Sequence, residues 1–323
     1  MKKLMLMVSA IAAGFTSVAQ ADISISGSAG LGYVSGNTNV SDVYTGGAIS
    51  FALSSTLDNG VTVSTSAGIR MDTNDTKSTT ATGSGVTYQL STGFTAITFA
   101  SGNNSLTWGM DVGLAGEGSG SVGGVASDLV DEGGYARNNS AGMAQDSGGG
   151  VSVSTVVGDA SVSASFIAQL PTQLDGSNEV RFGDSADTTA TGLSISMPMG
   201  AFAVTAGYAD VENTETQTGI KAAYTMAGGT VTVGFTQVDN NSGSDESAWG
   251  ATYSTTLGSA TLKVGHNNAK VGIYSGSQTE VQLSQSLGGG ASVYAELQTM
   301  NDSSGSNATT DGSNIAIGTK YAF

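Results

Sequence analysis

The chain contains no cysteine, so neither disulfide bridges nor thiol chemistry can hold its fold. It has only two prolines, and beyond its first 21 residues it has no apolar run long enough for a membrane-spanning helix. Basic side chains are also scarce, with 10 Lys and Arg against 26 Asp and Glu and a formal net charge of −16. This acidic balance argues against a nucleic-acid-binding protein, because phosphates need Lys and Arg. It also argues against peripheral binding to anionic lipid.

The first 21 residues have the pattern of a signal peptide. Met1–Lys3 is basic, Leu4–Phe15 is apolar, and Ala19-Gln20-Ala21 is a small-x-small cleavage site. The apolar run is too short to span a bilayer as a helix, which takes about 20 residues. We therefore expect an exported protein whose mature chain is a single domain over residues 22–323. Loss of Lys2 and Lys3 brings its formal charge to −18.

What the sequence has in abundance is glycine, serine and threonine between apolar residues that recur with a period of two. Ile23, Ile25, Leu31 and Tyr33 begin this alternation, which predicts β-strands with one apolar face. Seven short turns and eight longer connections give 16 strands, and the turns are expected at Asp58–Gly60, near Gly93, at Gly158-Asp159, Pro198–Gly200, Ala227–Gly229, Gly258-Ser259 and Gly288–Gly290.

An even strand number with short turns on one side and longer loops on the other favours a closed antiparallel 16-stranded transmembrane β-barrel. A strand of about 10 residues tilted by 45° covers roughly 23 Å, close to the hydrocarbon band of such barrels. A soluble β-sandwich would also alternate, but it needs large aromatics between two sheets, which these strands lack. A β-solenoid needs a repeat of fixed length, and none occurs.

Charged and aromatic residues support the barrel. Six charged residues fall between the apolar positions and are expected to face the lumen, namely Arg70, Lys221, Lys263, Lys320, Glu280 and Glu296. On the lipid face a Lys or Arg would cost about 2–4 kcal/mol at mid-depth. Two aromatic belts are expected on the outward face, from Tyr33, Tyr44, Tyr208 and Trp249 near the loop ends and Phe202, Tyr224, Tyr321 and Phe323 near the turn ends.

The longest interruption of the alternation is a glycine-rich, acidic insert over residues 102–148. Connections of that length are uncommon unless they are functional or disordered. We expect the insert to fold into the lumen as a constriction, because it could reach across a barrel roughly 34 Å wide and return. Its acids outnumber Arg137 and predict a preference for cations, unless they lie in a solvated part of the loop; they are Asp111, Glu117, Asp128, Asp131 and Glu132.

No catalytic constellation can be assembled around the single histidine, His266, so no enzymatic activity is expected. No cofactor is expected either, with one possible exception in the acidic outer loops. Residues Asp239–Glu246 place oxygen ligands at alternate positions, as calcium loops do, but the final bidentate acid is missing. This stretch is either a solvated loop or a site for a divalent cation that bridges to lipopolysaccharide phosphates.

Several features together resemble the general diffusion porins of Gram-negative bacteria, in particular those of alphaproteobacteria. They are the signal segment, the opening Asp22–Gly27, the insert after the fifth strand and the ending Lys320–Phe323. The resemblance implies an outer-membrane homotrimer whose third outer loop folds inward. It also implies that Tyr321 and Phe323 form the signal read by the barrel-assembly machinery. The chain departs from the family pattern in having few arginines.

The resemblance implies passive diffusion of small hydrophilic solutes and ions through the lumen. The small outward residues Gly27 and Ala29 would permit close packing between barrels in a trimer. The alternative that the sequence leaves open is a structural or adhesive cell-surface protein without an open pore.

Overall fold

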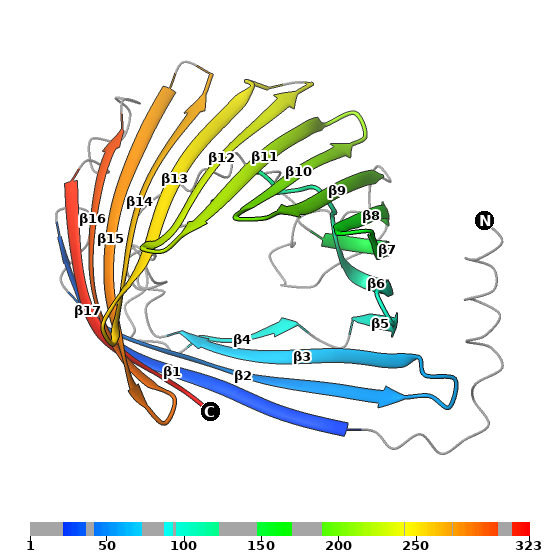
Figure 1. The fold of residues 1–323 in the computed structure, drawn as a ribbon, viewed down its shortest axis with the longest axis horizontal. Coiled ribbons are helices and arrows are strands. Elements are labelled where there is room, and N and C mark those ends of the chain that lie inside the picture. The colour runs from blue at the N-terminus through cyan, green and yellow to red at the C-terminus, as the bar shows by residue number, and fades with distance from the viewer. Residues whose placement is uncertain are drawn as a thin grey trace.

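In a computed structural model, the chain forms an antiparallel sheet that closes on itself as a barrel (Figure 1). The structure describes residues 22–36, 42–72, 87–92, 95–122, 147–169, 189–241, 243–272, 274–302 and 312–323. The expected signal peptide lies outside these ranges. The strands are β1 (Asp22–Gly36), β2 (Asp42–Thr56), β3 (Thr62–Asp72), β4 (Thr87–Thr92), β5 (Ala96–Ser101), β6 (Asn104–Gly113), β7 (Ser147–Val157), β8 (Ala160–Gln169), β9 (Ala190–Met199), β10 (Phe202–Val211), β11 (Glu215–Met226), β12 (Gly229–Asn240), β13 (Glu246–Leu257), β14 (Ala260–Val271), β15 (Tyr274–Gly288), β16 (Ala291–Asp302) and β17 (Gly312–Ala322).

The 17 segments occupy 16 positions in the barrel wall, because β4 and β5 lie one after the other along β3. Arg70 of β3 is paired with Gln89 of β4, and Ser64 of the same strand is paired with Thr98 of β5. Every other strand pairs with its neighbours in sequence, and β1 also pairs with β17. The closed, antiparallel, 16-stranded barrel predicted from the sequence is therefore confirmed.

The prediction of a tight turn near Gly93 is wrong, and this shifts the start of the insert. Because β4 and β5 share one position, the turn lies instead at Gly102-Asn103, between β5 and β6. Gly102 adopts a φ of +56°, a left-handed conformation that favours glycine. Residues 104–113 are thus the fifth strand, and the insert comprises residues 114–146 instead of 102–148.

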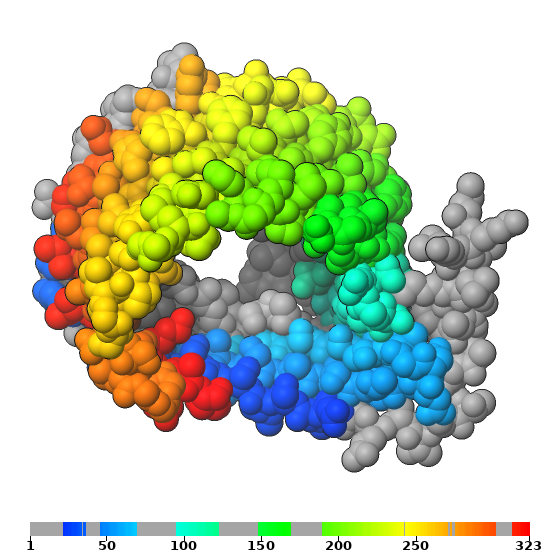
Figure 2. All heavy atoms as spheres, in the orientation of Figure 1, coloured from blue at the N-terminus to red at the C-terminus, as the bar shows by residue number. Residues whose placement is uncertain are grey.

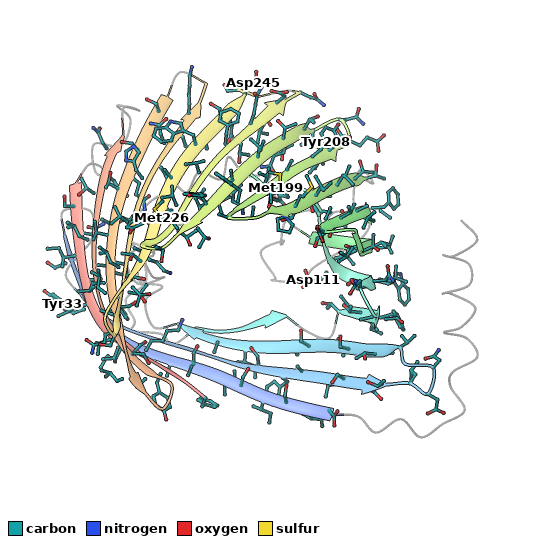
Figure 3. The ribbon with its side chains drawn as sticks, viewed as in Figure 1. Tyr33, Asp111, Met199, Tyr208, Met226 and Asp245 are labelled. Carbon is teal, nitrogen blue, oxygen red and sulfur yellow. The ribbon has the colours of Figure 1, made fainter. Side chains whose placement is uncertain are left out.

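Most of the described strands present large apolar side chains to the outside of the barrel. Ile23 is 66% exposed, Ile315 is 56% exposed and Leu193 is 50% exposed. Tyr33 points away from the barrel in Figure 3. A continuous apolar surface of this kind has no place in water but matches the hydrocarbon of a bilayer. No helix in the described ranges is long and apolar enough to cross a membrane.

Aromatic residues gather near the two ends of the strands. At the turn end the rings of Phe202 and Tyr224 lie 4.5 Å apart, centroid to centroid. At the loop end Trp249 lies 5.3 Å from the ring of His266, which hydrogen-bonds the hydroxyl of Thr279 at 2.8 Å. The outward position expected for these rings agrees with their exposure. The side chain of Tyr44 lies outside the described set.

The seam between the first and last strands is paired from Gly36–Asn314 to Ser28–Ala322, and the last residue extends it by one further pair. Gly27 N–H donates to the Phe323 carbonyl at 3.0 Å, and Phe323 N–H donates to the Gly27 carbonyl at 3.0 Å. The Phe323 ring covers Gly27, since a Cβ on this glycine would lie 2.4 Å from its Cζ atom. Gly27 therefore seats an aromatic ring of its own chain, and the expectation that it leaves room for a second barrel is wrong.

Candidate functional site

The barrel encloses a lumen, which appears as a hollow at the centre of the space-filling view (Figure 2). The residues between the apolar outward positions line it, as the pleat of a strand requires. Lys221 follows the outward Ile220, Lys263 lies between Leu262 and Val264, and Lys320 precedes the outward Tyr321. Lys221 is half-buried, whereas Lys263 and Lys320 are exposed. Arg70 lies on β3, but its side chain is not among those described.

A second set of inward residues is polar and almost fully buried. Glu280 is 0% exposed and Glu296 is 3% exposed. The amide of Gln278 donates to Glu280, and the amide of Gln282 donates to Glu296 at 2.6 Å. The carboxylates of β15 and β16 are therefore held in a network of amides on the side of the wall formed by β14–β17.

The same network contains amides that the sequence did not single out. Asn314 Nδ2 donates to Gln298 Oε1 at 3.1 Å. Within the described structure, neither polar atom of Asn267 nor Nε2 of Gln298 has a hydrogen-bond partner, although both residues are buried. The signal that could have found them is a polar amide at an inward position of a strand.

The described part of the insert, residues 114–122, lies against the inner wall. Ala115 N–H donates to the hydroxyl of Ser165 on β8 at 2.8 Å, and Gly118 N–H donates to Gln217 Oε1 on β11 at 3.0 Å. Within the segment, Ser119 N–H donates to the Gly116 carbonyl at 3.2 Å. The segment thus runs along the wall from β8 toward β12 as a chain of turns.

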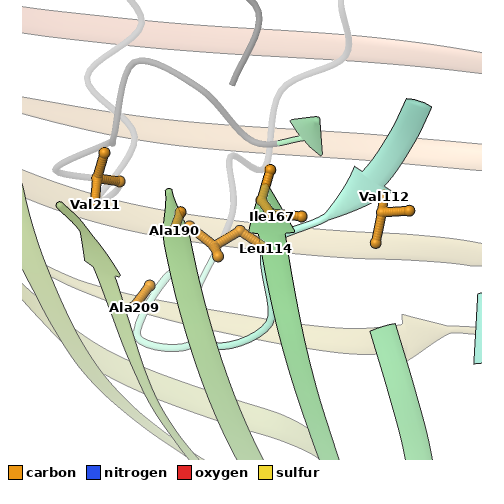
Figure 4. Close-up of a cluster of buried hydrophobic side chains, with 6 residues drawn as sticks. All are labelled: Val112, Leu114, Ile167, Ala190, Ala209 and Val211. Atoms are coloured by element: carbon orange, nitrogen blue, oxygen red, sulfur yellow. The ribbon is translucent and has the colours of Figure 1, made fainter. Parts of the chain in front are cut away.

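An apolar cluster holds the base of this segment (Figure 4). Leu114 is buried against inward side chains of β8, β9 and β10, next to Val112 at the end of β6. The other members of the cluster are Ile167, Ala190, Ala209 and Val211. Burial of a full aliphatic side chain stabilises by about 1.5–3 kcal/mol. This cluster, which sequence reasoning did not identify, therefore fixes where the insert leaves the wall strand.

The predicted acidic site residues divide into three groups. Asp111 is not in the insert but on β6, where it is exposed beside a register shift between Gly109 and Val112 (Figure 3). Glu117 lies in the described segment and is half-buried. The remaining residues Asp128, Asp131, Glu132 and Arg137 lie outside the described ranges. The grouping of the five acids into one constriction therefore stays a prediction.

The outer loop over residues 239–246 is organised by its own hydrogen bonds. Asn240 N–H donates to Asp245 Oδ1 at 3.2 Å, and Asn240 Nδ2 donates to the Ser244 carbonyl at 2.8 Å. Among the residues described, no group of three or more His, Asp or Glu side chains is close enough to hold a metal ion. Calcium binding in this loop stays a prediction.

A search against curated proteins finds no match. Solved structures share the fold at low identity. An outer membrane protein of Vibrio cholerae, OmpT with loop L8 deleted, is 11% identical with a TM-score of 0.66, covering 94% of this chain and 99% of that one. A porin refined at 1.8 Å is 15% identical with a TM-score of 0.66, and the match covers 94% of this chain and 100% of that porin. A Rhodobacter blastica porin variant is 14% identical with a TM-score of 0.62 over the same shares.

The family comparison agrees with the architecture. The model of the family described as "Gram-negative porin" matches residues 8–323, which is nearly the whole chain. Apolar outward faces, a polar inner wall and a closed 16-stranded sheet are what such a channel requires. The chain belongs to the Gram-negative porin family and forms an outer-membrane channel.

Proposed function

We propose that this channel passes small hydrophilic solutes and ions by passive diffusion, without catalysis. The observation that carries the proposal is the inner wall of the closed barrel, where Lys221, Lys263 and Lys320 are half-buried or exposed at inward positions. These side chains offer water and ions polar partners in the lumen, whereas an adhesive surface protein has no need of a polar lumen. This consideration favours the channel over the occluded alternative.

We further propose that the insert narrows the passage and makes it prefer cations. The corrected insert of residues 114–146 can still reach about 54 Å out and back at 3.3 Å per residue, which exceeds the radius of the barrel. Glu280 and Glu296 add acid to the wall. A narrow passage through a low-dielectric wall concentrates the field of such charges and enriches cations.

The test is electrical. The purified protein, reconstituted in a planar bilayer, should give discrete conductance steps, and its reversal potential in a salt gradient should have the sign of cation preference. Changing Asp128, Asp131 and Glu132 together to amides should reduce the cation-to-anion permeability ratio by about fivefold, a free-energy change of about 1 kcal/mol. Preference for anions, or a ratio that the amides leave unchanged, would contradict the proposal for the insert.

A matched control removes two carboxylate charges at the opposite end of the barrel and is compared with the double variant in which Asp128 and Asp131 are changed to amides. Asp58 and Asp159 are exposed in the short turns after β2 and β7. Their amide variants should retain the original permeability ratio. If they lower it as much as the insert variants do, the selectivity comes from the overall charge of the protein.

We also propose that the barrel assembles as a homotrimer in the outer membrane, in contact with lipid and lipopolysaccharide. The continuous apolar outer face supports burial in lipid or against neighbouring barrels. With Gly27 covered by Phe323, Ala29 is the small outward residue of β1 that remains for contact between barrels. Native mass spectrometry in mild detergent should give three times the subunit mass, and a monomer alone would reject this part of the proposal.

A further inference from the structure

Along the path of the insert, four neighbouring strands of the inner wall have a glycine where the insert crosses them. Four strands, β9 to β12, each place one glycine on their inward face under residues 114–122, namely Gly192, Gly207, Gly219 and Gly234. A Cβ on Gly192 would lie 1.8 Å from the carbonyl oxygen of Ala115. Real Cβ atoms do not approach backbone this closely, so alanine at this position requires the insert to move.

The contacts continue from strand to strand. A Cβ on Gly207 would lie 2.1 Å from Oγ of Ser119, one on Gly219 would lie 2.4 Å from the nitrogen of Gly120, and one on Gly234 would lie 2.0 Å from the carbonyl oxygen of Gly120. Each of these three glycines therefore touches the insert through its Cα.

The insert contributes glycines of its own to the same contact. A Cβ on Gly116 would lie 2.2 Å from the Tyr208 carbonyl oxygen, and one on Gly120 would lie 1.9 Å from the Phe235 carbonyl oxygen. Gly118, in contrast, has a φ of +61° and no atom within 4 Å of a Cβ, so it faces open space. The backbone of the insert is thus in direct contact with the backbone of the wall.

The positions of the wall glycines follow the geometry of the barrel. The strand partner of Gly192 on β10 is Ala209, so the row of wall glycines moves by two residues along β10 to reach Gly207. Gly207 is itself paired with Gly219, so the next step is zero. Gly219 in turn lies opposite Thr236, two residues beyond Gly234. At a strand tilt of about 45°, a path at right angles to the barrel axis moves by about 1.4 residues per strand. The glycines match this path, so they run around the inside of the barrel at one depth.

The alternation between a shift of zero and a shift of two residues from strand to strand continues beyond residues 114–122, on β13 and β14. Gly250 on β13 lies opposite Gly234, and Gly265 on β14 lies two residues before Asn267, the partner of Gly250. Both glycines are buried. The next inward residue in register is Glu280, which ends the glycine row at the amide and carboxylate network.

We propose that Gly192, Gly207, Gly219 and Gly234 form a track in the wall that seats residues 114–122, and that this track sets how far the insert stands into the pore. The track is a positioning device, because it touches the insert and not the solute. Its effect on permeation rests on the proposed function of the insert as a constriction. The seating itself can be tested without that assumption.

The experiment uses thiol labelling in the full protein, which has no cysteine of its own. Ser119→Cys places one thiol in the seated segment, where Ser119 is 8% exposed. It should react slowly with a small water-soluble maleimide. Gly192→Ala or Gly219→Ala should raise the rate by about tenfold or more, because labelling follows the population in which the segment has left the wall.

The matched control is Gly30→Ala. Gly30 also faces the lumen, but its nearest neighbour would lie 3.5 Å from the new Cβ, which is ordinary contact. It should leave the labelling rate unchanged. An equal rise in this control, or no rise in either track variant, would overturn the proposal.

A second pair of substitutions changes only the insert and leaves every strand of the barrel unaltered, so it serves even if the wall variants fail to fold. Gly120→Ala should release the segment and raise labelling of the thiol at position 119, whereas Gly118→Asn should not, since asparagine tolerates a left-handed φ and this position is open. Slow labelling in the Gly120→Ala variant would also overturn the track. Conductance of the same variants then reports separately on whether the insert determines the width of the pore.

Discussion

Removal of Phe323 is expected to prevent most of the protein from reaching its assembled state in the outer membrane. The deletion takes away both hydrogen bonds with Gly27, which form the turn end of the seam between β1 and β17, and the ring that covers this glycine. Two backbone hydrogen bonds contribute about 2 kcal/mol, which makes pairing at this end of the seam about thirtyfold less favourable. A frayed seam end also leaves unpaired backbone groups on two strand edges, which invites aggregation.

The measurement is the amount of folded barrel in outer-membrane fractions, detected by the different gel mobility of heated and unheated samples. Phe323→Tyr keeps the ring and the backbone and should assemble normally. Gly27→Val should assemble poorly, because its side chain would occupy the position of the ring. Leu287→Ala removes an exposed apolar side chain from a nearby turn end and serves as the control. A deletion variant at normal level would refute the role of the seam.

A lysine on the outward face of β11 should cost far more stability than one on the inward face of the next strand. Ile220 lies at the middle of β11 and is 52% exposed on the apolar face, so Ile220→Lys would place a charge in hydrocarbon. We expect it to lower the free energy of unfolding by about 2–4 kcal/mol. The adjacent Lys221 faces the lumen and is tolerated in the native sequence.

The control for this prediction is Thr232→Lys, at an inward position of β12 between Val231 and Val233. Equilibrium unfolding in guanidinium, with the protein in lipid vesicles, should show a loss within about 1 kcal/mol for this variant. Similar losses for the two variants would mean that the outward face is not the lipid face.

Much of the barrel could be predicted because its signal is local. Side chains on a strand alternate with a period of two, so Ile23, Ile25 and Leu31 reveal an apolar face without knowledge of any partner strand. The inward positions of Lys221 and Glu280 follow from the same period. The number of strands followed from short turns, which glycine marks directly, as at Gly158 and Gly258 with φ of +64° and +65°.

The misplaced turn shows the limit of local signals. Gly93 and Gly102-Asn103 both separate short apolar segments, and nothing within either stretch decides which one reverses the chain. The decision comes from pairing, because β3 is long enough to bind β4 and β5 in succession while β6 pairs with β5. The length of a partner strand distant in sequence is information that neither glycine carries.

The sequence by itself determined the barrel, its two faces and the position of a long acidic insert after the fifth strand. Only the tertiary structure decided that Gly27 lies under Phe323, that Gln278 donates to Glu280 with Gln298 opposite it on β16, and that four wall glycines lie beneath residues 114–122. The physical reason is register. The tilt and closure of the whole sheet decide which residues of neighbouring strands lie side by side. A glycine becomes a contact site for the insert only when the insert packs against it.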